Sequence, residues 1–306
     1  MRVGLIDVDG HRFPNLALMR ISSYHKGRGD TVEWWDGWAH YDVVYMSKVF
    51  SHDYTPDEFE PVNADKIVKG GTGYAISLVN GREVYDASMN PDLPPEIESC
   101  TPDYGIYPQY DFAVAMTSRG CPRGCSFCHV AAKEGRRSVK VADVSVFWRG
   151  QAHIEVLDPN ITACPDKREL FRQYLATGAI INFNQGLDIR CLNDDDIADL
   201  NTMRLEEVHF AWDNAKEDLR SAFERYAKKG KHTRHGRLGT VYCLTNFNST
   251  LEEDLYRVYT LNELGYFPYI MLYDKTHADA QHRALQRWCN NRWIFKSCPR
   301  FEDYRP

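Results

Sequence analysis

The sequence predicts an α/β protein in which a small Rossmann-like α/β layer precedes a barrel, or part of a barrel, built from six βα units. Three observations lead to this prediction. From residue 111 onward, short apolar runs typical of buried strands alternate with longer segments of helical period. A shorter series of the same kind occupies residues 1–73, and a proline-rich stretch at residues 75–110 separates the two series.

The chain of 306 residues is 43% hydrophobic, which is enough for a substantial core. We expect two domains, at residues 1–110 and 111–306, the second with a C-terminal extension. No apolar run approaches the ~20 residues that span a bilayer, and Met1 leads directly into a strand-like segment without a signal peptide. We therefore expect a cytoplasmic protein without a membrane partner, in which the nine cysteines are thiols or metal ligands.

The first series reads as a strand at residues 1–8, a turn at Asp9-Gly10, a helix through about residue 26, and strands at 32–35, 41–49 and 64–69. Asp9-x-His11, Ser47 and Gly70-Gly71 follow these strands in an order that resembles cobalamin-binding domains. That family's motif has a glycine where this chain has Pro14. We therefore expect a degenerate domain that packs on the barrel without cobalamin, and a cobalamin-dependent methyltransferase stays an alternative.

The second series predicts parallel βαβ units. Asn193 and Ser249 are the expected N-caps of two of its helices, because each precedes a cluster of acidic residues. The expected strands lie at residues 112–117, 153–158, 179–184, 206–212, 240–245 and 268–273, and the helices near 141–149, 166–177, 193–203, 215–229, 249–264 and 278–290.

Three cysteines, Cys121, Cys125 and Cys128, stand in one glycine- and proline-containing loop directly after the first of these strands. Three thiolates at this spacing supply three of the four ligands of a four-iron cluster and leave one iron open, whereas a structural zinc site needs four protein ligands. A zinc knuckle with a distant fourth ligand, or three unrelated thiols, are the alternatives. A non-catalytic metal-binding module is therefore the rival to an enzyme.

The stretch from Gly120 to Cys128, with Phe127 before the last cysteine, resembles the signature of the radical S-adenosylmethionine (radical SAM) superfamily. The resemblance implies a partial (βα)6 TIM-like barrel and a 4Fe-4S cluster held by the three cysteines, with Phe127 beside the cofactor. It also implies an enzyme that reductively cleaves S-adenosylmethionine to a 5′-deoxyadenosyl radical, which abstracts hydrogen from a substrate.

Polar residues at the expected strand ends are candidates for binding S-adenosylmethionine. By position in the family, Asp158 and Asn160 after the second strand would accept hydrogen bonds from its amino group. Arg190 after the third strand would pair with its carboxylate. An ordinary ion pair between Asp188 and Arg190 is the alternative. The complete candidate set is Phe127, Asp158, Asn160, Gln185, Asp188, Arg190 and Asp213.

Strand parity predicts which side chains face the interior. On the fourth strand Val208, Phe210 and Trp212 should pack on the outer helices, while His209 and Asp213 face inward. Such polar interior positions predict a small polar substrate, with a purine- or deazapurine-type base or nucleoside as the leading candidate. The candidate substrate contacts are Asn182, Asn184, His209, Tyr273 and Asp274.

Two basic stretches carry predictions about partners. Residues that follow the cysteine loop, namely Lys133, Arg136, Arg137 and Lys140, are expected to attract an acidic reductant such as flavodoxin or ferredoxin, or a phosphate-bearing substrate. The run at residues 225–237 is expected to be a solvated loop, and with a net charge of −6 we expect no nucleic-acid partner. Cys164, Cys191, Cys289 and Cys298 have no ligand-like spacing and are expected to be small packed thiols.

Overall fold

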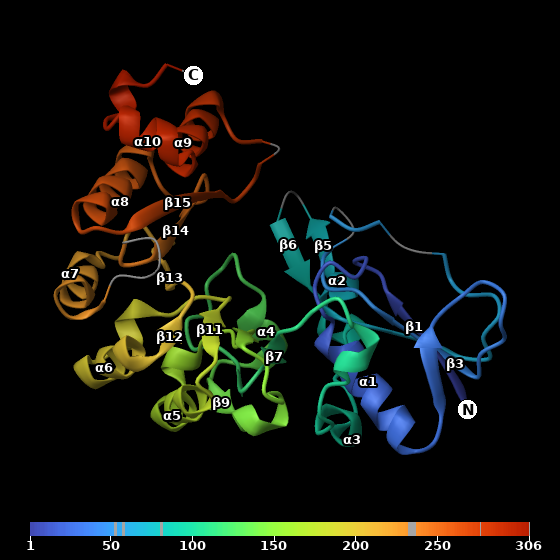
Figure 1. Cartoon of the computed structure of the whole chain (residues 1–306). Helices are drawn as coiled ribbons and strands as arrows, with labels where there is room; N and C mark the ends of the chain where they lie inside the picture. The colour runs from blue at the N-terminus through green and yellow to red at the C-terminus, as the bar shows by residue number, and fades with distance from the viewer. Residues whose placement is uncertain (52–53, 57–58, 80–81, 232–236, 276, 306) are drawn as a thin grey trace. The chain divides into compact units, whose positions relative to one another are not determined.

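The computed structural model describes residues 1–51, 54–56, 59–79, 82–231, 237–275 and 277–305 (Figure 1). They divide into two compact units. The first unit comprises residues 1–114, 120–136 and 142–151, and the second comprises residues 115–119, 137–141 and 152–306. Within the described ranges, none of the helices combines the length and apolar character needed to cross a bilayer.

A four-stranded parallel sheet in the order β2-β1-β3-β4 forms the centre of the first unit. Its strands are β1 (Arg2–Asp7), β2 (Thr31–Trp34), β3 (Val43–Ser47) and β4 (Ile67–Gly70). Between β1 and β2 runs α1 (Leu16–Gly27), which begins where Asn15 accepts a hydrogen bond from the Leu18 amide at 3.2 Å. The strands and the helix predicted for residues 1–73 are therefore present, each strand within a few residues of its expected place.

Residues 75–110, the proline-rich stretch that separates the two series in the sequence, belong to the first unit. After the short helix α2 (Thr72–Ala75), β5 (Ile76–Val79) and β6 (Arg82–Tyr85) pair antiparallel, and α3 (Pro95–Glu98) follows. Ile97, Ile106 and Tyr107 lie in the same hydrophobic cluster as Val3 and Leu5 of β1. The proline-rich composition of this stretch did not indicate that these three side chains belong to the core. Their burial stabilises the unit.

Two sets of strands form the second unit. The first sheet has the order β12-β11-β10-β7, in which β10 (His153–Val156), β11 (Ile180–Phe183) and β12 (Arg204–Leu205) are parallel. The last residue of β7 (Ala113–Ala115) belongs to this unit and accepts a hydrogen bond from the Leu157 amide at 2.8 Å. The second sheet is parallel, and its strands neighbour one another in chain order. They are β13 (His209–Ala211), β14 (Thr240–Thr245) and β15 (Phe267–Leu272).

A parallel bridge between Leu187 and Phe210 links the loop after β11 to β13. The six predicted strands, now β7, β10, β11, β13, β14 and β15, therefore neighbour one another in the order in which they occur in the chain. The predicted α/β class with parallel sheets is confirmed. The fourth strand, expected at residues 206–212, is shorter and covers only His209–Ala211. Just before the expected strand, residues 204–205 pair with β11 as the separate strand β12.

The helices of the second unit lie along one side of its strands (Figure 1). They are α5 (Lys167–Thr177), α6 (Asp194–Thr202), α7 (Arg220–Lys229), α8 (Leu251–Glu263), α9 (Ala280–Asn290) and α10 (Arg292–Ser297). The predicted cap at Asn193 is confirmed as a capping box with Asp196. The cap predicted at Ser249 is wrong by one residue, since Thr250 forms the capping box with Glu253.

The helix predicted at residues 141–149 is also wrong. Only a 3-10 turn at Val144–Val146 forms there, because a Val-Ser-Val run has low helix propensity.

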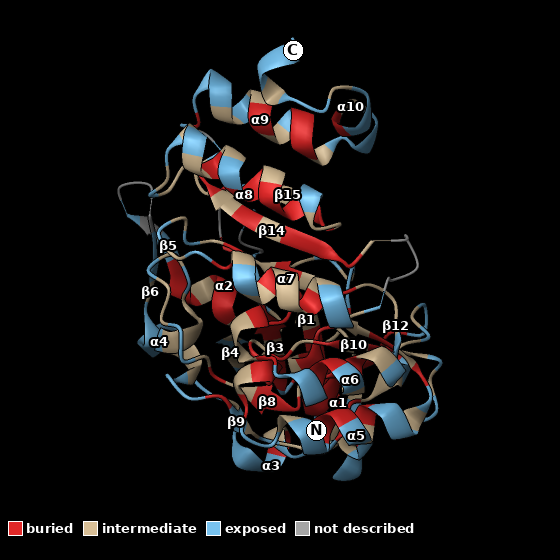
Figure 2. Ribbon diagram, turned by 90° about the vertical axis from the view of Figure 1, so that its left-hand side faces the viewer, coloured by how far each residue is buried: buried red, intermediate tan, exposed pale blue. Residues whose placement is uncertain are grey.

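The predicted strand parity is correct: the Phe210 ring lies 6.0 Å from that of Phe223 and 4.9 Å from that of Tyr226, both on α7. Figure 2 shows buried residues along β14 and on the inner side of α8.

Candidate functional site

The cysteine-bearing loop leaves and re-enters the second unit through a two-stranded ribbon. β8 (Ser118–Arg119) pairs antiparallel with β9 (Val139–Lys140), and the Val141 amide donates to the Thr117 carbonyl at 2.8 Å. All three cysteines lie between these two short strands. The ribbon therefore joins the two chain segments that flank the loop, residues 118–119 and 139–140.

Asp158 holds the start of this ribbon. Its carboxylate is 2% exposed and accepts four hydrogen bonds, from the amides of Thr117 (2.7 Å) and Ser118 (2.6 Å) and from both hydroxyls (2.8 and 2.7 Å). Burial raises the pKa of Asp158 to about 6, although these hydrogen bonds favour the charged form and lower the pKa. In this structure the side chain anchors Thr117 and Ser118, and contact with a cofactor amino group stays a prediction.

The loop itself is folded back on its own backbone. The Gly120 amide donates to the Glu134 carboxylate at 3.1 Å, and the Cys121 amide donates to the Gly135 carbonyl at 3.1 Å. The Cys128 amide donates to the Cys125 carbonyl at 3.0 Å. Gly120 and Gly124 have φ angles of 86° and 58°, a region that other residues rarely occupy.

The thiol chemistry of this loop fits a metal cluster in its donor set. Each of the three thiols is open to solvent at least in part, since Cys121 and Cys125 are half-buried and Cys128 is exposed. Across the described ranges, no group of three or more His, Cys, Asp or Glu side chains is placed to hold a metal ion. Of the four cysteines predicted to be packed thiols, Cys164 and Cys289 are buried, whereas Cys191 and Cys298 are only half-buried.

Replacing Gly124 by alanine should disrupt the loop. A Cβ atom at this position would displace the guanidinium group of Arg136 from the loop, and the positive φ would strain the new residue in addition. We expect Gly124→Ala to reduce bound iron severalfold after anaerobic reconstitution, with little change in thermal unfolding. Gly150→Ala is the matched control, because its φ is also positive at 99° and its Cβ would meet nothing within 4 Å. Equal iron content in both variants would contradict this expectation.

The segment after β11 brings several predicted cofactor residues together. Nε of Arg190 lies 2.6 Å from Asp188 and Nη1 lies 2.7 Å from Glu217. The side-chain Nδ2 of Asn160 donates to the Asp188 carboxylate at 3.4 Å. The side-chain Oδ1 of Asn160 accepts from the Thr162 hydroxyl and the Ala163 amide. The ion pair considered as the alternative for Asp188 and Arg190 is therefore present, with Arg190 26% exposed. Gln185 is exposed.

Asp213 lies directly after β13, with the Leu244 amide donating to its carboxylate at 3.1 Å. Burial raises the pKa of Asp213 to about 6, against the lowering effect of this hydrogen bond and of the charges on Arg257 and Arg190. Arg257, which is 1% exposed, donates to the carbonyls of Trp212 and Leu244 and to Asp254. It therefore holds the ends of β13 and β14 in register on either side of Asp213.

The raised pKa of Asp213 predicts a pH dependence of stability. Because the folded protein binds this proton more tightly than the unfolded chain does, the contribution is complete below about pH 4 and is lost as pH rises through about 6. We expect the unfolding free energy of wild type, relative to Asp213→Asn, to fall by up to about 3 kcal/mol between pH 4 and pH 7. Urea unfolding of both proteins at several pH values measures this difference. A constant difference would contradict it.

A row of polar and aromatic side chains faces inward across β10, β11, β13, β14 and β15. Asn182 donates to Glu155 at 2.8 Å, and its own Oδ1 is buried with no hydrogen-bond partner among the described residues. His209 stacks on Tyr242 with an interplanar angle of 12°, and Tyr242 meets Tyr269 edge-on at 5.7 Å. Burial raises the pKa of Glu155 and lowers that of His209.

Sequence reasoning missed Glu155 and Tyr242 in this row. The parity that singled out Asn182 and His209 could have found both, because Glu155 pairs with Asn182 and Tyr242 pairs with Ala211 in the strand registers. The remaining substrate candidates lie elsewhere. Asn184 is exposed, Tyr273 packs on Phe247 at 4.6 Å, and Asp274 bonds to His277 at 2.8 Å.

The residues that resembled a cobalamin motif make contacts within the first unit. Asp9 accepts from the Val49 amide at 2.6 Å and from the Thr55 hydroxyl at 2.9 Å, and Ser47 accepts from Asn15 at 2.8 Å. His11 has a φ of 61°, and its ring meets that of Trp34 edge-on at 4.1 Å. Each of these side chains therefore has a role in local packing.

Comparison with models of known protein families and with curated proteins finds no match for this chain.

Proposed function

We propose that this chain is a radical SAM enzyme. The observation that carries the proposal is the placement of Cys121, Cys125 and Cys128 in one loop directly after the first of six strands that neighbour one another in chain order. That strand order also supports our more specific proposal that the second unit is a partial (βα)6 barrel. In such folds the loops after the strands carry the chemistry.

In this proposal the three cysteines hold a 4Fe-4S cluster. When bound, the cluster would pass one electron from the reductant to S-adenosylmethionine, whose S–C5′ bond would break to give methionine and the 5′-deoxyadenosyl radical that abstracts hydrogen from the substrate. Asp158 keeps the entry of the cysteine loop fixed through Thr117 and Ser118. Arg257 fixes the strand ends beside Asp213, which we assign to binding the ribose of the cofactor.

The inward-facing row supports a planar, polar substrate. The buried Oδ1 of Asn182 is an acceptor for a substrate N–H group, because an unpaired buried acceptor costs about 1–3 kcal/mol. The stacked His209 and Tyr242 rings provide an aromatic surface next to it in the strand order. A purine- or deazapurine-type base or nucleoside has both the flat face and the hydrogen-bonding edge that these groups would satisfy.

The proposal places the protein in the cytosol, with flavodoxin or ferredoxin as the reductant. Lys133 and Arg136 lie on the cysteine loop itself, and Lys140 lies on β9 at its exit. The Lys133 ammonium lies 3.5 Å from the Glu134 carboxylate, and the Lys140 ammonium lies 2.5 Å from the Glu169 carboxylate. Part of this positive charge is therefore paired. Cations at these positions would attract an acidic electron donor.

Metal analysis and a substrate panel test the proposal together. Anaerobically reconstituted protein should contain iron and acid-labile sulfide in equal amounts, and 5′-deoxyadenosine formation should rise with a purine or deazapurine but not with sugars or amino acids. Stoichiometric zinc without sulfide would instead indicate a metal-binding module. Bound corrinoid after incubation with cobalamin would indicate a cobalamin-dependent methyltransferase. Stimulation by a sugar alone would refute the proposed substrate class.

A further inference from the structure

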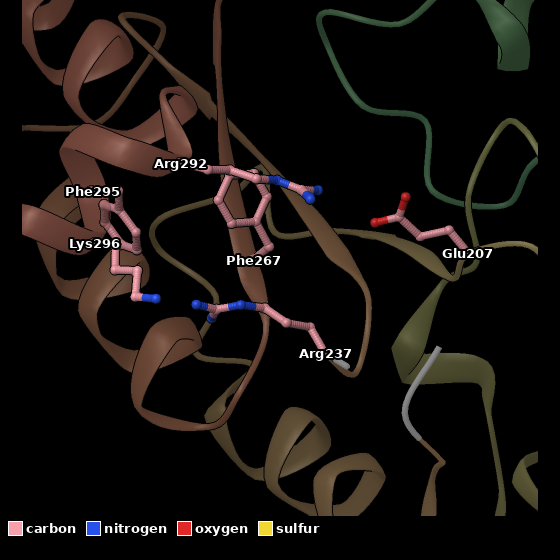
Figure 3. Close-up of a pocket in the computed structure, with 6 residues that line it drawn as sticks. All are labelled: Glu207, Arg237, Phe267, Arg292, Phe295 and Lys296. Atoms are coloured by element: carbon pink, nitrogen blue, oxygen red, sulfur yellow. The ribbon is translucent and has the colours of Figure 1, made fainter. Parts of the chain in front are cut away.

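A cavity of about 220 Å³ lies at the amino-terminal edge of the sheet β13-β14-β15 in the second unit. Phe267 is the first residue of β15, and Glu207 and Arg237 lie two and three residues before β13 and β14. Asp213, a candidate cofactor contact, lies after the opposite end of β13. The residues that line the cavity are Glu207, Arg237, Phe267, Arg292, Phe295 and Lys296 (Figure 3).

The lining of this cavity is strongly cationic. Three cationic side chains, those of Arg237, Arg292 and Lys296, and one carboxylate, that of Glu207, line it, which leaves an excess of two positive charges. Arg292 and Lys296 are four residues apart on α10, a spacing at which like charges repel. Figure 3 shows the Lys296 ammonium and the Arg237 guanidinium pointing toward one another. An anion between these groups would remove the repulsion.

The two guanidinium groups are held in place by their surroundings. Arg292 lies over the Phe267 ring at 4.6 Å, and Arg237 lies 6.0 Å from the centroid of the same ring. Arg237 also donates to the Tyr266 carbonyl at 2.9 Å. Burial, together with the charge of Arg292, lowers the pKa of Arg237. These contacts position the cations before a ligand arrives, which lowers the entropic cost of binding.

We propose that this cavity binds a phosphate dianion, either free or as the terminal group of a phosphorylated small molecule. Two negative charges match the excess of positive charge, and a tetrahedral phosphate offers oxygens to cations that approach from different directions. Guanidinium groups bind phosphate through paired hydrogen bonds, and an ammonium adds a point charge. A monocarboxylate would leave one positive charge uncompensated.

The basic run at residues 225–237 had been expected to be a solvated loop. Residues 232–236, including Arg234, lie outside the described residues. Arg237 does not fit the expectation, because its guanidinium contacts Tyr266 and Phe267 and lines this cavity. The run therefore ends in a residue of the proposed anion site.

Isothermal titration calorimetry of the full chain tests the proposal at constant ionic strength with chloride as the competing anion. Inorganic phosphate and phenyl phosphate are the two probes. We expect saturable binding in the wild type, weakened at least about tenfold in Arg292→Gln and in Lys296→Gln. Glu207→Gln should strengthen binding severalfold, because it removes the opposing charge and keeps an acceptor for Thr240.

Arg287→Gln is the matched control, because this exposed arginine of α9 does not line the cavity. Its affinity for both probes should equal that of wild type. Tighter binding of phenyl phosphate identifies a phosphorylated molecule as the ligand, and equal binding identifies free phosphate. The proposal is overturned if wild type shows no saturable binding of either probe, or if Arg287→Gln loses as much affinity as the two cavity variants. Circular dichroism melting checks that each variant is folded.

Discussion

Cys121→Ala, Cys125→Ala and Cys128→Ala should each lose nearly all of the visible 4Fe-4S absorbance and nearly all cleavage of S-adenosylmethionine, by a factor of at least about 100. A cluster held by only two thiolates is labile. Loss of any one cysteine should therefore remove the cluster as completely as loss of all three. Iron and sulfide content, the visible spectrum and 5′-deoxyadenosine formation measure the loss.

Two control variants make this result specific to the motif. Cys100→Ala and Cys298→Ala each remove a half-buried thiol elsewhere in the chain and should keep the iron content of wild type. If either control lost the cluster to the same extent, the ligand set would not be the three cysteines of the loop. If all three loop variants kept it, the assignment of the motif would be wrong.

Asp158→Asn should destabilise the second unit by about 3 kcal/mol and reduce the iron that the loop retains. The asparagine amide would place a donor against one of the two backbone amides, of Thr117 and Ser118, that now donate to the carboxylate. One buried donor would be left unpaired and the charge-assisted hydrogen bonds would be lost. Urea unfolding measures the stability, and reconstitution measures the iron.

Asp166→Asn is the matched control for this variant. Asp166 is exposed, and its side chain makes no capping hydrogen bond to α5. We expect its effect to be within about 0.5 kcal/mol of wild type. If Asp158→Asn kept wild-type stability and iron content, the carboxylate would not be the anchor of the loop.

Local patterns were sufficient to predict most elements of the fold. The alternation of strands and helices placed β14 at its observed residues and α5 to within one residue, because hydrophobic period and capping are local properties. The failures came from tertiary effects. The β5–β6 hairpin was missed although Asn80-Gly81 is a hairpin signal in the sequence, because the prolines that follow suggested a linker.

The candidate site was predictable to a smaller extent. The cysteine spacing and strand parity singled out residues by type and place, but they could not show which carboxylates already have partners. Asp158 and Asp188 both bond to nearby backbone and side-chain groups, and those partners are set by loops that carry no periodic signal. Tyr242 was missed because a tyrosine in a strand also reads as ordinary core.

The most direct test of the central claim is the amount of 5′-deoxyadenosine formed by reduced, reconstituted protein supplied with S-adenosylmethionine. The account predicts at least one equivalent per cluster in the wild type and none above background in Cys125→Ala. Protein that carries a complete 4Fe-4S complement under these conditions and forms no 5′-deoxyadenosine would contradict it.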